Sequence, residues 1–222
     1  SQTDLFGNSN MANKFETIHR QIDELENKLG KHVVYLASSS NAIKNKRKGK
    51  FRLIMCGITG FIGSGDRGDL EEMIAAIKYR GPDDTGVFLT DGVGLAHARL
   101  SVIDLSQQGH QPMFNDDKSV GLIFNGEIYN FKKLRERLVR RGYKFKSNTD
   151  TEAIIRLYED ICEDCFKELD GMFAIGLYDF KQKKLILARD RMGKKPLYWG
   201  IFGGTLMFAS ELKALLKHPL FE

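Results

Sequence analysis

The sequence predicts an α+β fold whose sheets are largely antiparallel. Short apolar segments bounded by glycine and other turn residues recur along the chain, as strands require, and amphipathic segments with helical spacing separate them. The last four strand segments follow one another through short, turn-like loops, which favours antiparallel pairing. Many short strands with few helices indicate two sheets that bury one face against each other and the other face under helices.

The first 55 residues are expected to form an N-terminal extension, residues 1–55, ahead of one domain. Apolar side chains alternate at spacings of three and four over 12–29, which predicts a short amphipathic helix that packs on this chain or on a partner. A short strand is expected over 32–37. A basic run over 44–52 is expected to be a solvated linker that a protease could reach, in preference to a patch for anionic partners.

The first half of the domain, which spans 56–222, is expected to hold strands and two helices. A glycine-bounded apolar run after Cys56 is typical of a strand, and Asp69 is expected to cap a helix that ends in a turn at 81–84. A second helix is expected over 130–142. The remaining strands of this half are expected over 85–89, 93–99 and 120–125.

The second half is expected to begin with a helix that starts at Asp150. Its helical pattern continues to residue 169 and includes Cys162 and Cys165, a lone C-x-x-C. No second pair of ligands accompanies them, so two cysteines on a helix face are favoured over a redox or metal site. The four final strands are expected over 172–180, 184–189, 197–202 and 205–209.

Charge and hydropathy exclude several classes of protein. The net charge of +5 belongs to residues 1–55, which hold ten lysines and arginines against five acidic residues, whereas residues 56–222 hold 24 of each. The domain therefore lacks the basic surface that nucleic acid binding requires. No apolar run approaches the roughly 20 residues of a membrane span. Nothing at the N-terminus reads as a secretory signal, so a cytoplasmic protein is expected.

A nucleophilic side chain, Cys56, stands immediately before the first strand of the domain. Cleavage of the bond between Met55 and Cys56 would free an α-amine with a pKa of about 8, and the cysteine would then carry its own general base. In the printed chain Cys56 is internal, and its amide nitrogen accepts no proton. Translation from Met55 followed by removal of the methionine would supply the amine, and so would proteolysis.

Four sequence blocks follow one another at intervals typical of a known family. They read MCGITGF at 55–61, YRGPDD at 79–84, AHARLSVID at 96–104 and FNGEIYN at 124–130. Together they resemble the glutaminase domain of class II glutamine amidotransferases, the N-terminal-nucleophile type. GHQPM at 109–113 and FASELKALL at 208–216 most resemble the N-terminal half of glutamine-hydrolysing asparagine synthetases. The resemblance implies a four-layer αββα sandwich with two mainly antiparallel sheets.

The resemblance also implies a set of catalytic residues. Cys56 would form a thioester with the side chain of glutamine and release ammonia. Asn125 would contribute its side-chain amide, and Gly126 its backbone N–H, to an oxyanion hole; both are chemically suitable donors. Without the resemblance, Asn125 and Gly126 could also form a hairpin turn.

Glutamine recognition would require groups that bind an α-carboxylate and an α-ammonium. Arg99 can bind the carboxylate with two parallel hydrogen bonds, and Asp150 can pair with the ammonium. Taken alone, Arg99 would be a salt bridge at a strand end and Asp150 a helix N-cap. The resemblance places the following residues against glutamine: Arg99, Leu100, Ser101, Val102, Ile103, Asn125, Gly126, Glu127 and Asp150.

Three other functions are compatible with these residues. The first is a Cys-His hydrolase in which His97 or His110 assists Cys56. This is disfavoured because Cys56 precedes a strand, and no helix N-terminus lowers its pKa. The second is an amidotransferase for another acceptor, such as an amino sugar or a nucleotide precursor. The third is a non-catalytic glutamine-binding module in which the extension blocks Cys56.

No cofactor or metal is expected in this chain. ATP and magnesium would belong to the synthetase half of an asparagine synthetase, and residues 1–222 contain no serine-glycine-rich pyrophosphatase loop. The expected partners are glutamine and an ATP-dependent synthetase domain or subunit that converts aspartate to asparagine. A homodimer is considered as well, whereas nucleic acid and membrane partners are not expected.

Overall fold

The computed structural model describes residues 33–36, 55–100 and 107–221. The helix expected over 12–29 and the basic linker expected over 44–52 lie outside these residues. The short strand expected over 32–37 is confirmed as β1, Val33–Leu36.

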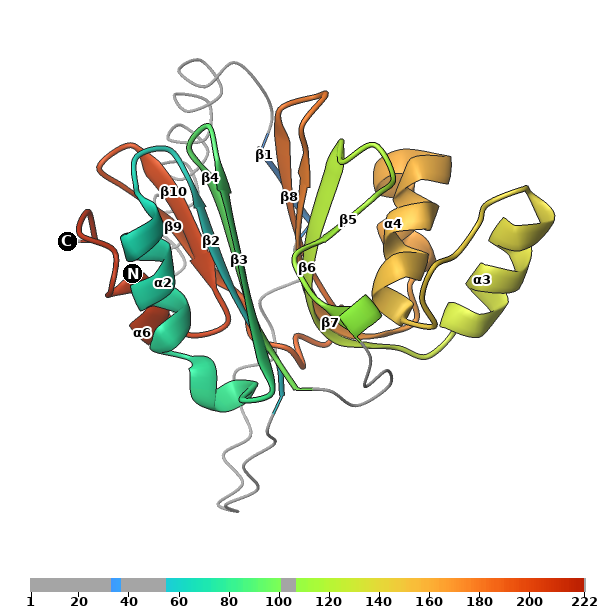
Figure 1. Ribbon diagram of the computed structural model, residues 1–222, viewed down its shortest axis with the longest axis horizontal. Helices are drawn as coiled ribbons and strands as arrows, with labels where there is room; N and C mark the ends of the chain where they lie inside the picture. The colour runs from blue at the N-terminus through green and yellow to red at the C-terminus, as the bar shows by residue number, and fades with distance from the viewer. Residues whose placement is uncertain (1–32, 37–54, 101–106, 222) are drawn as a thin grey trace, which may run out of the picture.

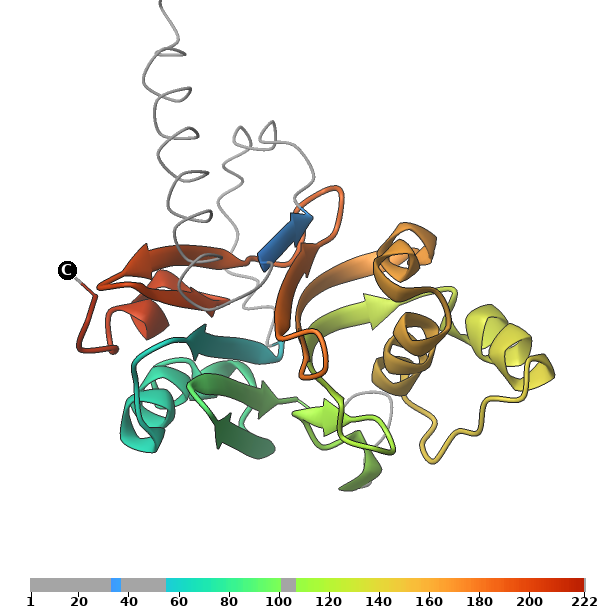
Figure 2. The same ribbon diagram turned by 90° about the horizontal axis from the view of Figure 1, so that it is seen from above.

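Ten strands form two five-stranded sheets (Figures 1 and 2). In spatial order, the first sheet contains β1, β8 (Lys184–Arg189), β7 (Gly171–Asp179), β6 (Val120–Ile128) and β5 (Met113–Phe114). The second sheet contains β3 (Asp84–Thr90), β4 (Val93–Arg99), β2 (Gly57–Ile62), β10 (Thr205–Ala209) and β9 (Tyr198–Phe202). All neighbouring strands are antiparallel except β1 and β8, which are parallel. The predicted antiparallel character is therefore confirmed.

Helices cover the outer face of each sheet, so the molecule has four layers (Figure 1). The second sheet is covered by α2 (Arg67–Ala75) and α6 (Leu212–Leu215). The first sheet is covered by α4 (Asp150–Ile161), against which α3 (Phe131–Arg140) and α5 (Cys165–Glu168) pack. Three 3₁₀ turns complete the described elements: η1 (Lys78–Arg80), η2 (Gln107–Gly109) and η3 (Cys162–Asp164). The αββα sandwich is confirmed.

Alternating side chains divide the interior into three apolar cores. On β2, Ile58 points between the sheets, whereas Phe61 points outward to α2, and both are fully buried. On β6, Ile123 points between the sheets, whereas Leu122 lies in the core under α4. This period of two explains why strands buried on both faces read as continuous apolar runs.

Two local expectations were wrong. Asp66, and not Asp69, caps α2: Asp66 Oδ1 accepts from the N–H of Asp69 at 2.9 Å, and Asp69 Oδ2 accepts from the N–H of Asp66 at 2.8 Å. In this reciprocal capping box, two aspartates three residues apart both look like caps. The helical pattern from Asp150 also breaks at Cys162, whose φ of 50° ends α4. Cys162 is consequently exposed while Cys165 is buried, so they do not share one helix face.

The described helices are all too short or too polar to cross a membrane.

Candidate active site

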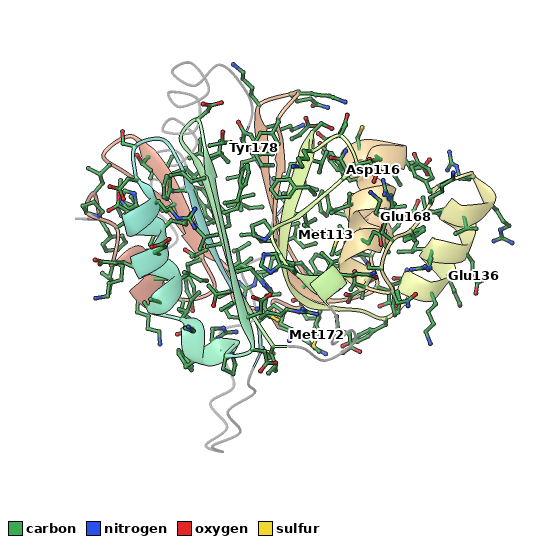
Figure 3. All side chains as sticks on the ribbon, in the orientation of Figure 1. Met113, Asp116, Glu136, Glu168, Met172 and Tyr178 are labelled. Atoms are coloured by element: carbon green, nitrogen blue, oxygen red, sulfur yellow. The ribbon has the colours of Figure 1, made fainter. Side chains whose placement is uncertain are left out.

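A cavity of about 200 Å³ opens at one end of the sandwich, between the two sheets. Met172, which lines it, lies at the lower end of the molecule in Figure 3. The cavity brings together seven of the residues expected at the site: Cys56, Arg99, Leu100, Asn125, Gly126, Glu127 and Asp150. The other three, Ser101, Val102 and Ile103, lie outside the described residues.

Cys56 lies immediately before β2 and is held by backbone contacts. The N–H of Leu100 donates to its sulfur at 3.3 Å, and Arg80 Nε donates to its carbonyl oxygen at 3.1 Å. Arg80 is itself fixed by Glu211 at 2.6 Å. Burial raises the pKa of the Cys56 thiol, and the Leu100 N–H and the charges of Arg99 and Lys195 offset only part of this rise. The resting thiol is therefore protonated at neutral pH, and it needs a base before it can attack.

Asn125 and Gly126 lie within a strand and not in a turn. Strand β6 continues to Ile128, with Asn125 opposite Ala174 and Gly126 opposite Phe173. The hairpin-turn interpretation is therefore wrong, because both residues pair along β7. A Cβ atom at Gly126 would lie 2.2 Å from the Met172 carbonyl oxygen, so only glycine fits there.

The alternation of β6 directs the Gly126 N–H into the cavity. Even-numbered residues present their backbone groups to the side away from β7: the N–H of Phe124 donates to Gln111 Oε1 at 2.7 Å, and that of Ile128 donates to Asp150 Oδ2 at 3.1 Å. Gly126 lies between these two residues and has the same orientation.

The side chain of Asn125 is 1 % exposed, and its Nδ2 has no hydrogen-bond partner among the described residues. A buried amide donor without a partner costs free energy, unless a ligand completes the bond. Two donors, the Asn125 amide and the Gly126 N–H, thus face one cavity that also contains a thiol. Such an arrangement can stabilise the oxyanion that forms when the sulfur attacks the carbon of a carbonyl group.

Arg99 and Asp150 give the cavity one cationic and one anionic group. Arg99 is the last residue of β4, and Asp150 the first of α4; both are buried. A Cβ at Gly109 would lie 2.2 Å from Arg99 Nη2, so the guanidinium packs directly on the glycine backbone. Burial raises the pKa of Asp150 to about 6, the N–H of Ile128 opposes the rise, and the charge of Glu127 adds to it. An ammonium ligand would restore the carboxylate.

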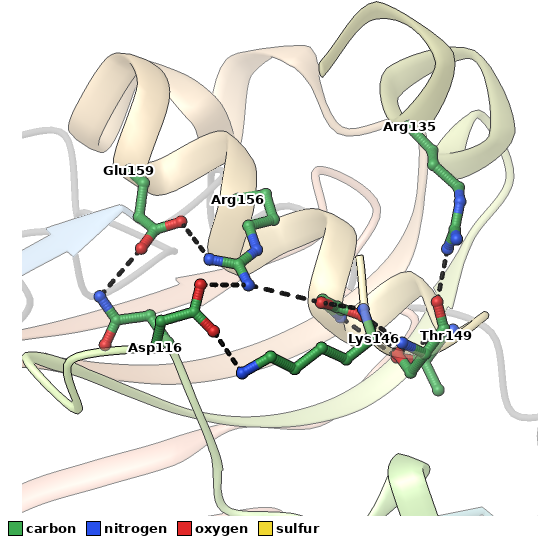
Figure 4. Close-up of polar contacts among 9 residues, drawn as sticks. Asp116, Arg135, Lys146, Thr149, Arg156 and Glu159 are labelled. Carbon is green, nitrogen blue, oxygen red and sulfur yellow. Dashed lines mark hydrogen bonds and ion pairs between the residues drawn. The ribbon is translucent and has the colours of Figure 1, made fainter. Parts of the chain in front are cut away.

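The N-terminus of α4 is fixed by a polar network (Figure 4). Thr149, and not Asp150, is its N-cap: Thr149 Oγ1 accepts from the N–H of Glu152 at 3.2 Å. The Glu152 carboxylate accepts from the N–H groups of Lys146 and Ser147 at 2.8 and 2.6 Å. The N-cap interpretation of Asp150 is therefore wrong, and its carboxylate remains available to the cavity.

An outer group of ion pairs braces the same helix. Arg156 lies 3.0 Å from Asp116 and 3.0 Å from Glu159, and Lys146 lies 2.5 Å from Asp116 (Figure 4). These pairs tie α4 to the loop between β5 and β6. The helix that carries Asp150 is thus held against the sheet that carries Asn125.

Neither histidine of the alternative mechanism is placed to assist Cys56. His110 is half exposed, lies 2.6 Å from Asp84 and is not among the residues that line the cavity. His97 lines the cavity, but its Nε2 lies 3.2 Å from the Phe124 carbonyl oxygen, to which it can only donate. Burial lowers the pKa of His97 to about 3. The structure therefore disfavours a Cys-His hydrolase.

Several cavity residues were not assigned from the sequence. Lys195 is 3 % exposed, and its Nζ donates to the Met55 sulfur. Burial lowers its pKa, and the charge of Arg80 lowers it further. Gln111, within the GHQPM block, had been given no role. A linear sequence does not show that Lys195 lies beside Met55 or that Gln111 reaches Phe124.

No group of three or more His, Cys, Asp and Glu side chains in the described part of the chain could hold a metal ion. The C-x-x-C pair, Cys162 and Cys165, is not accompanied by further ligands there.

Comparison with known proteins gives consistent results. Residues 55–222 match the family described as "Glutamine amidotransferase domain". The chain is 39% identical over 183 residues to "Putative asparagine synthetase [glutamine-hydrolyzing] 2" of Methanocaldococcus jannaschii, covering 73% of this chain and 35% of that protein. It is 44% identical over 168 residues to "Asparagine synthetase [glutamine-hydrolyzing] 2" of Arabidopsis thaliana, covering 72% and 28%. The chain thus spans about a third or less of these relatives.

The fold is shared with a solved enzyme of lower sequence similarity. Glutamine phosphoribosylpyrophosphate amidotransferase from B. subtilis superposes with a TM-score of 0.62 at 21% identity, covering 72% of this chain and 43% of that chain. At this identity the comparison concerns the fold alone.

Proposed function

Because this chain belongs to the glutamine amidotransferase domain family, we propose that its cavity hydrolyses glutamine to glutamate and ammonia through a thioester on Cys56. One observation carries the proposal: a buried Asn125 amide, which has no hydrogen-bond partner within the described part of the chain, shares a cavity with a thiol. An amide is a poor electrophile, so both a strong nucleophile and a stabilised oxyanion are needed.

The reaction requires a base, and the α-amine of Cys56 is the group proposed. The amine takes the proton from Sγ while Sγ attacks the side-chain carbonyl carbon of glutamine, and the carbonyl electron pair moves to oxygen. Asn125 Nδ2 and the Gly126 N–H stabilise that oxyanion. When it collapses, the C–N bond breaks, the ammonium of Cys56 returns its proton to nitrogen, and ammonia leaves. Water, deprotonated by the amine, then cleaves the thioester and restores the thiol.

This mechanism needs Cys56 at the N-terminus. With Met55 attached, the nitrogen of Cys56 is an amide and cannot act as the base. Burial raises the pKa of the Cys56 thiol, so the thiol does not ionise to a thiolate without a base near neutral pH. We therefore propose that the active form begins at Cys56, through loss of an initiator methionine at position 55 or through proteolysis.

Glutamine is proposed to bind by its two α-groups. The Arg99 guanidinium pairs with the carboxylate, and the Asp150 carboxylate pairs with the ammonium. Leu100, the segment 101–103 and Glu127 are proposed to complete the contacts. Arg99 and Asp150 belong to different layers of the sandwich. Their distance from the Cys56 sulfur is proposed to limit the length of the amino acid side chain that can reach the sulfur.

The ammonia is proposed to serve an ATP-dependent conversion of aspartate to asparagine. The support is the name shared by the relatives of this chain, several of which are asparagine synthetases. ATP and magnesium would then act in a synthetase domain or subunit that receives the ammonia. An acceptor other than aspartate remains the second candidate, because the acceptor site lies outside the residues that this chain contributes.

The test begins with the intact mass and N-terminal sequence of protein purified from its native cell, followed by glutamate release from glutamine. A Cys56 N-terminus with turnover supports the proposal. Turnover should be lost in Cys56→Ala and should fall about 100- to 1000-fold in Asn125→Ala. Full activity in Cys56→Ala would refute the nucleophile. An intact extension with glutamine binding and no turnover would favour the non-catalytic binding module.

A further inference from the structure

Strand β6 loses its edge partner before it reaches the cavity. Strand β5 pairs with β6 at only two positions, Met113 with Leu122 and Phe114 with Gly121. At Phe124 the backbone N–H and C=O still point to that side. Buried backbone groups without a partner are costly, so something other than a strand must complete them.

Two buried side chains take the place of the missing strand. Gln111 Oε1 accepts the N–H of Phe124 at 2.7 Å, and His97 Nε2 donates to the carbonyl oxygen of Phe124 at 3.2 Å. Gln111 precedes β5, whereas His97 lies on β4 of the opposite sheet. Their exposed fractions are 6 % and 0 %, so neither bond competes with water.

The two bonds act on the backbone that carries the proposed oxyanion hole. The Phe124 carbonyl belongs to the peptide unit that joins Phe124 to Asn125, and the Gly126 N–H follows one residue later. The Gln111 bond holds the peptide unit before Phe124, and the His97 bond holds the unit after it. Together they fix the direction from which the Asn125 amide and the Gly126 N–H enter the cavity. Preorganised donors stabilise an oxyanion because they need not reorient during the reaction.

Gln111 also links this strand to the helix that binds the substrate. Its Nε2 donates to Thr151 Oγ1 at 3.2 Å, and Thr151 follows Asp150 on α4. A single side chain thus spans the gap between the Phe124 edge and the start of α4.

We propose that His97 and Gln111 are positioning residues for this oxyanion hole, which clamp the Phe124 edge of β6 so that the Asn125 and Gly126 donors are preorganised. The inference rests on the proposed function, because it assumes that the cavity stabilises an oxyanion. It assigns no contact with substrate to either side chain.

The role of His97 is that of a neutral donor. Since Nε2 carries the hydrogen that the Phe124 carbonyl accepts, Nδ1 is unprotonated in the neutral ring; it has no hydrogen-bond partner among the described residues. Burial keeps the pKa at about 3; the charges of Arg99 and His110 lower it, and that of Asp84 raises it. The ring therefore stays neutral, and the bond to Phe124 is kept, at pH values well above 3.

The experiment compares two probes on the proposed active form, the protein whose chain begins at Cys56. Glutamate γ-semialdehyde forms a tetrahedral adduct when Cys56 Sγ adds to its carbonyl carbon, and the adduct oxygen occupies the oxyanion hole. Glutamate, the reaction product, binds through the α-groups without forming an adduct. In His97→Met and Gln111→Met, we expect aldehyde affinity and kcat to fall about 10- to 100-fold, whereas glutamate affinity and KM change less than about 2-fold.

Three variants serve as controls. His97→Gln keeps an N–H donor of similar reach, and Gln111→Glu keeps the acceptor, so both should recover most of the aldehyde affinity. Thr59→Val removes a comparable buried bond, from Thr59 Oγ1 to the Phe208 carbonyl at 3.0 Å on β2, and should leave both probes unchanged. If His97→Met does not fold, as judged by its thermal midpoint, Gln111→Met and His97→Gln still test the clamp.

The outcomes separate the two proposals. If the wild-type protein releases glutamate but the variants lose affinity for both probes equally, or for neither, the clamp is refuted and the proposed function stands. If the wild-type protein, with an N-terminal Cys56, binds neither probe and releases no glutamate, the proposed function fails and the clamp fails with it.

Discussion

The carboxylate of Asp150, at the start of α4, accepts a hydrogen bond at 3.1 Å from the backbone N–H of Ile128, at the end of β6. The helix that presents the proposed ammonium-binding group is thereby joined to the strand that presents Asn125 and Gly126. Substrate recognition and chemistry share one rigid frame, so a change at either side of this bond should be measurable at the other.

The raised pKa of Asp150 predicts a pH dependence of glutamine binding. With a pKa of about 6 in the free protein, the group becomes protonated as the pH falls through 6, and the neutral acid no longer pairs with an ammonium. The KM for glutamine should therefore rise below pH 6, separately from the fall in kcat that protonation of the Cys56 α-amine causes. Asp150→Asn should raise KM about 10- to 100-fold and remove this pH dependence. A KM independent of pH in the wild-type protein would contradict the assignment.

The same carboxylate predicts an opposition between stability and binding. Its pKa is raised above the unfolded value of 3.8, so the stability it contributes is present below pH 3.8 and is lost as the pH rises through 6. Asp150→Asn keeps an acceptor for the Ile128 N–H and removes the buried charge. The variant should be more stable at pH 7 by up to about 3 kcal/mol, measured by urea unfolding without ligand. A less stable Asp150→Asn variant would show that other groups of the protein stabilise the buried carboxylate of Asp150.

The packing of Arg99 against Gly109 predicts that lysine cannot replace it. A lysine ammonium offers one point charge in place of two parallel donors, so Arg99→Lys should raise the KM for glutamine about 10- to 100-fold with little change in kcat. Arg67→Lys is the matched control, because Arg67 is exposed and pairs only with Glu71 within α2. Unchanged glutamine binding in Arg99→Lys would show that Arg99 does not bind the α-carboxylate of glutamine through two parallel hydrogen bonds.

The burial of Lys195 beside Met55 and Cys56 predicts an effect on the thiol. The charge of Lys195 favours the thiolate, so Lys195→Met should raise the pKa of Cys56 further. Iodoacetamide alkylation of Cys56, followed by peptide mass spectrometry across pH, should shift to higher pH in Lys195→Met. Lys195→Arg should behave like the wild type. Lys194→Met, a change at the exposed neighbour, should have no effect. An equal shift of the alkylation profile in Lys194→Met would show that the effect comes from the loss of any positive charge and not from the position of Lys195.

The close approach at Gly126 predicts strain in Gly126→Ala. The added Cβ would meet the Met172 carbonyl oxygen at 2.2 Å, so β6 and β7 must separate at the site. We expect a loss of about 1 to 3 kcal/mol in unfolding free energy, together with loss of glutamate release. Gly68→Ala, in the first turn of α2, should keep glutamate release, because its Cβ meets only the capping oxygen Asp66 Oδ1 at 3.1 Å and not a residue that lines the cavity.

Local sequence could predict elements whose cause is local. Alternation and turn residues predicted β4 over 93–99 to the residue, and a two-residue period explains why His97 and Arg99 point into the same cavity. The start of α2 was misassigned by three residues, since Asp66 and Asp69 form a reciprocal box in which either could be the cap. Asn125 and Gly126 illustrate the limit, because the same pair suits a turn or a strand until β7 lies beside it.

Sequence patterns alone predicted the antiparallel α+β class, the proposed nucleophile Cys56 and, through the motif blocks, the family and the residues proposed to bind glutamine. The groups that reach these residues, and that the sequence left unassigned, became visible in the folded chain. Lys195 beside Met55, and Gln111 and His97 on the Phe124 edge, depend on contacts between segments separated by 13 to 140 residues. Such contacts arise when two sheets pack face to face, and one strand ends short of its neighbour. A linear pattern records periodicity along one strand, but not which side chain completes the backbone of another.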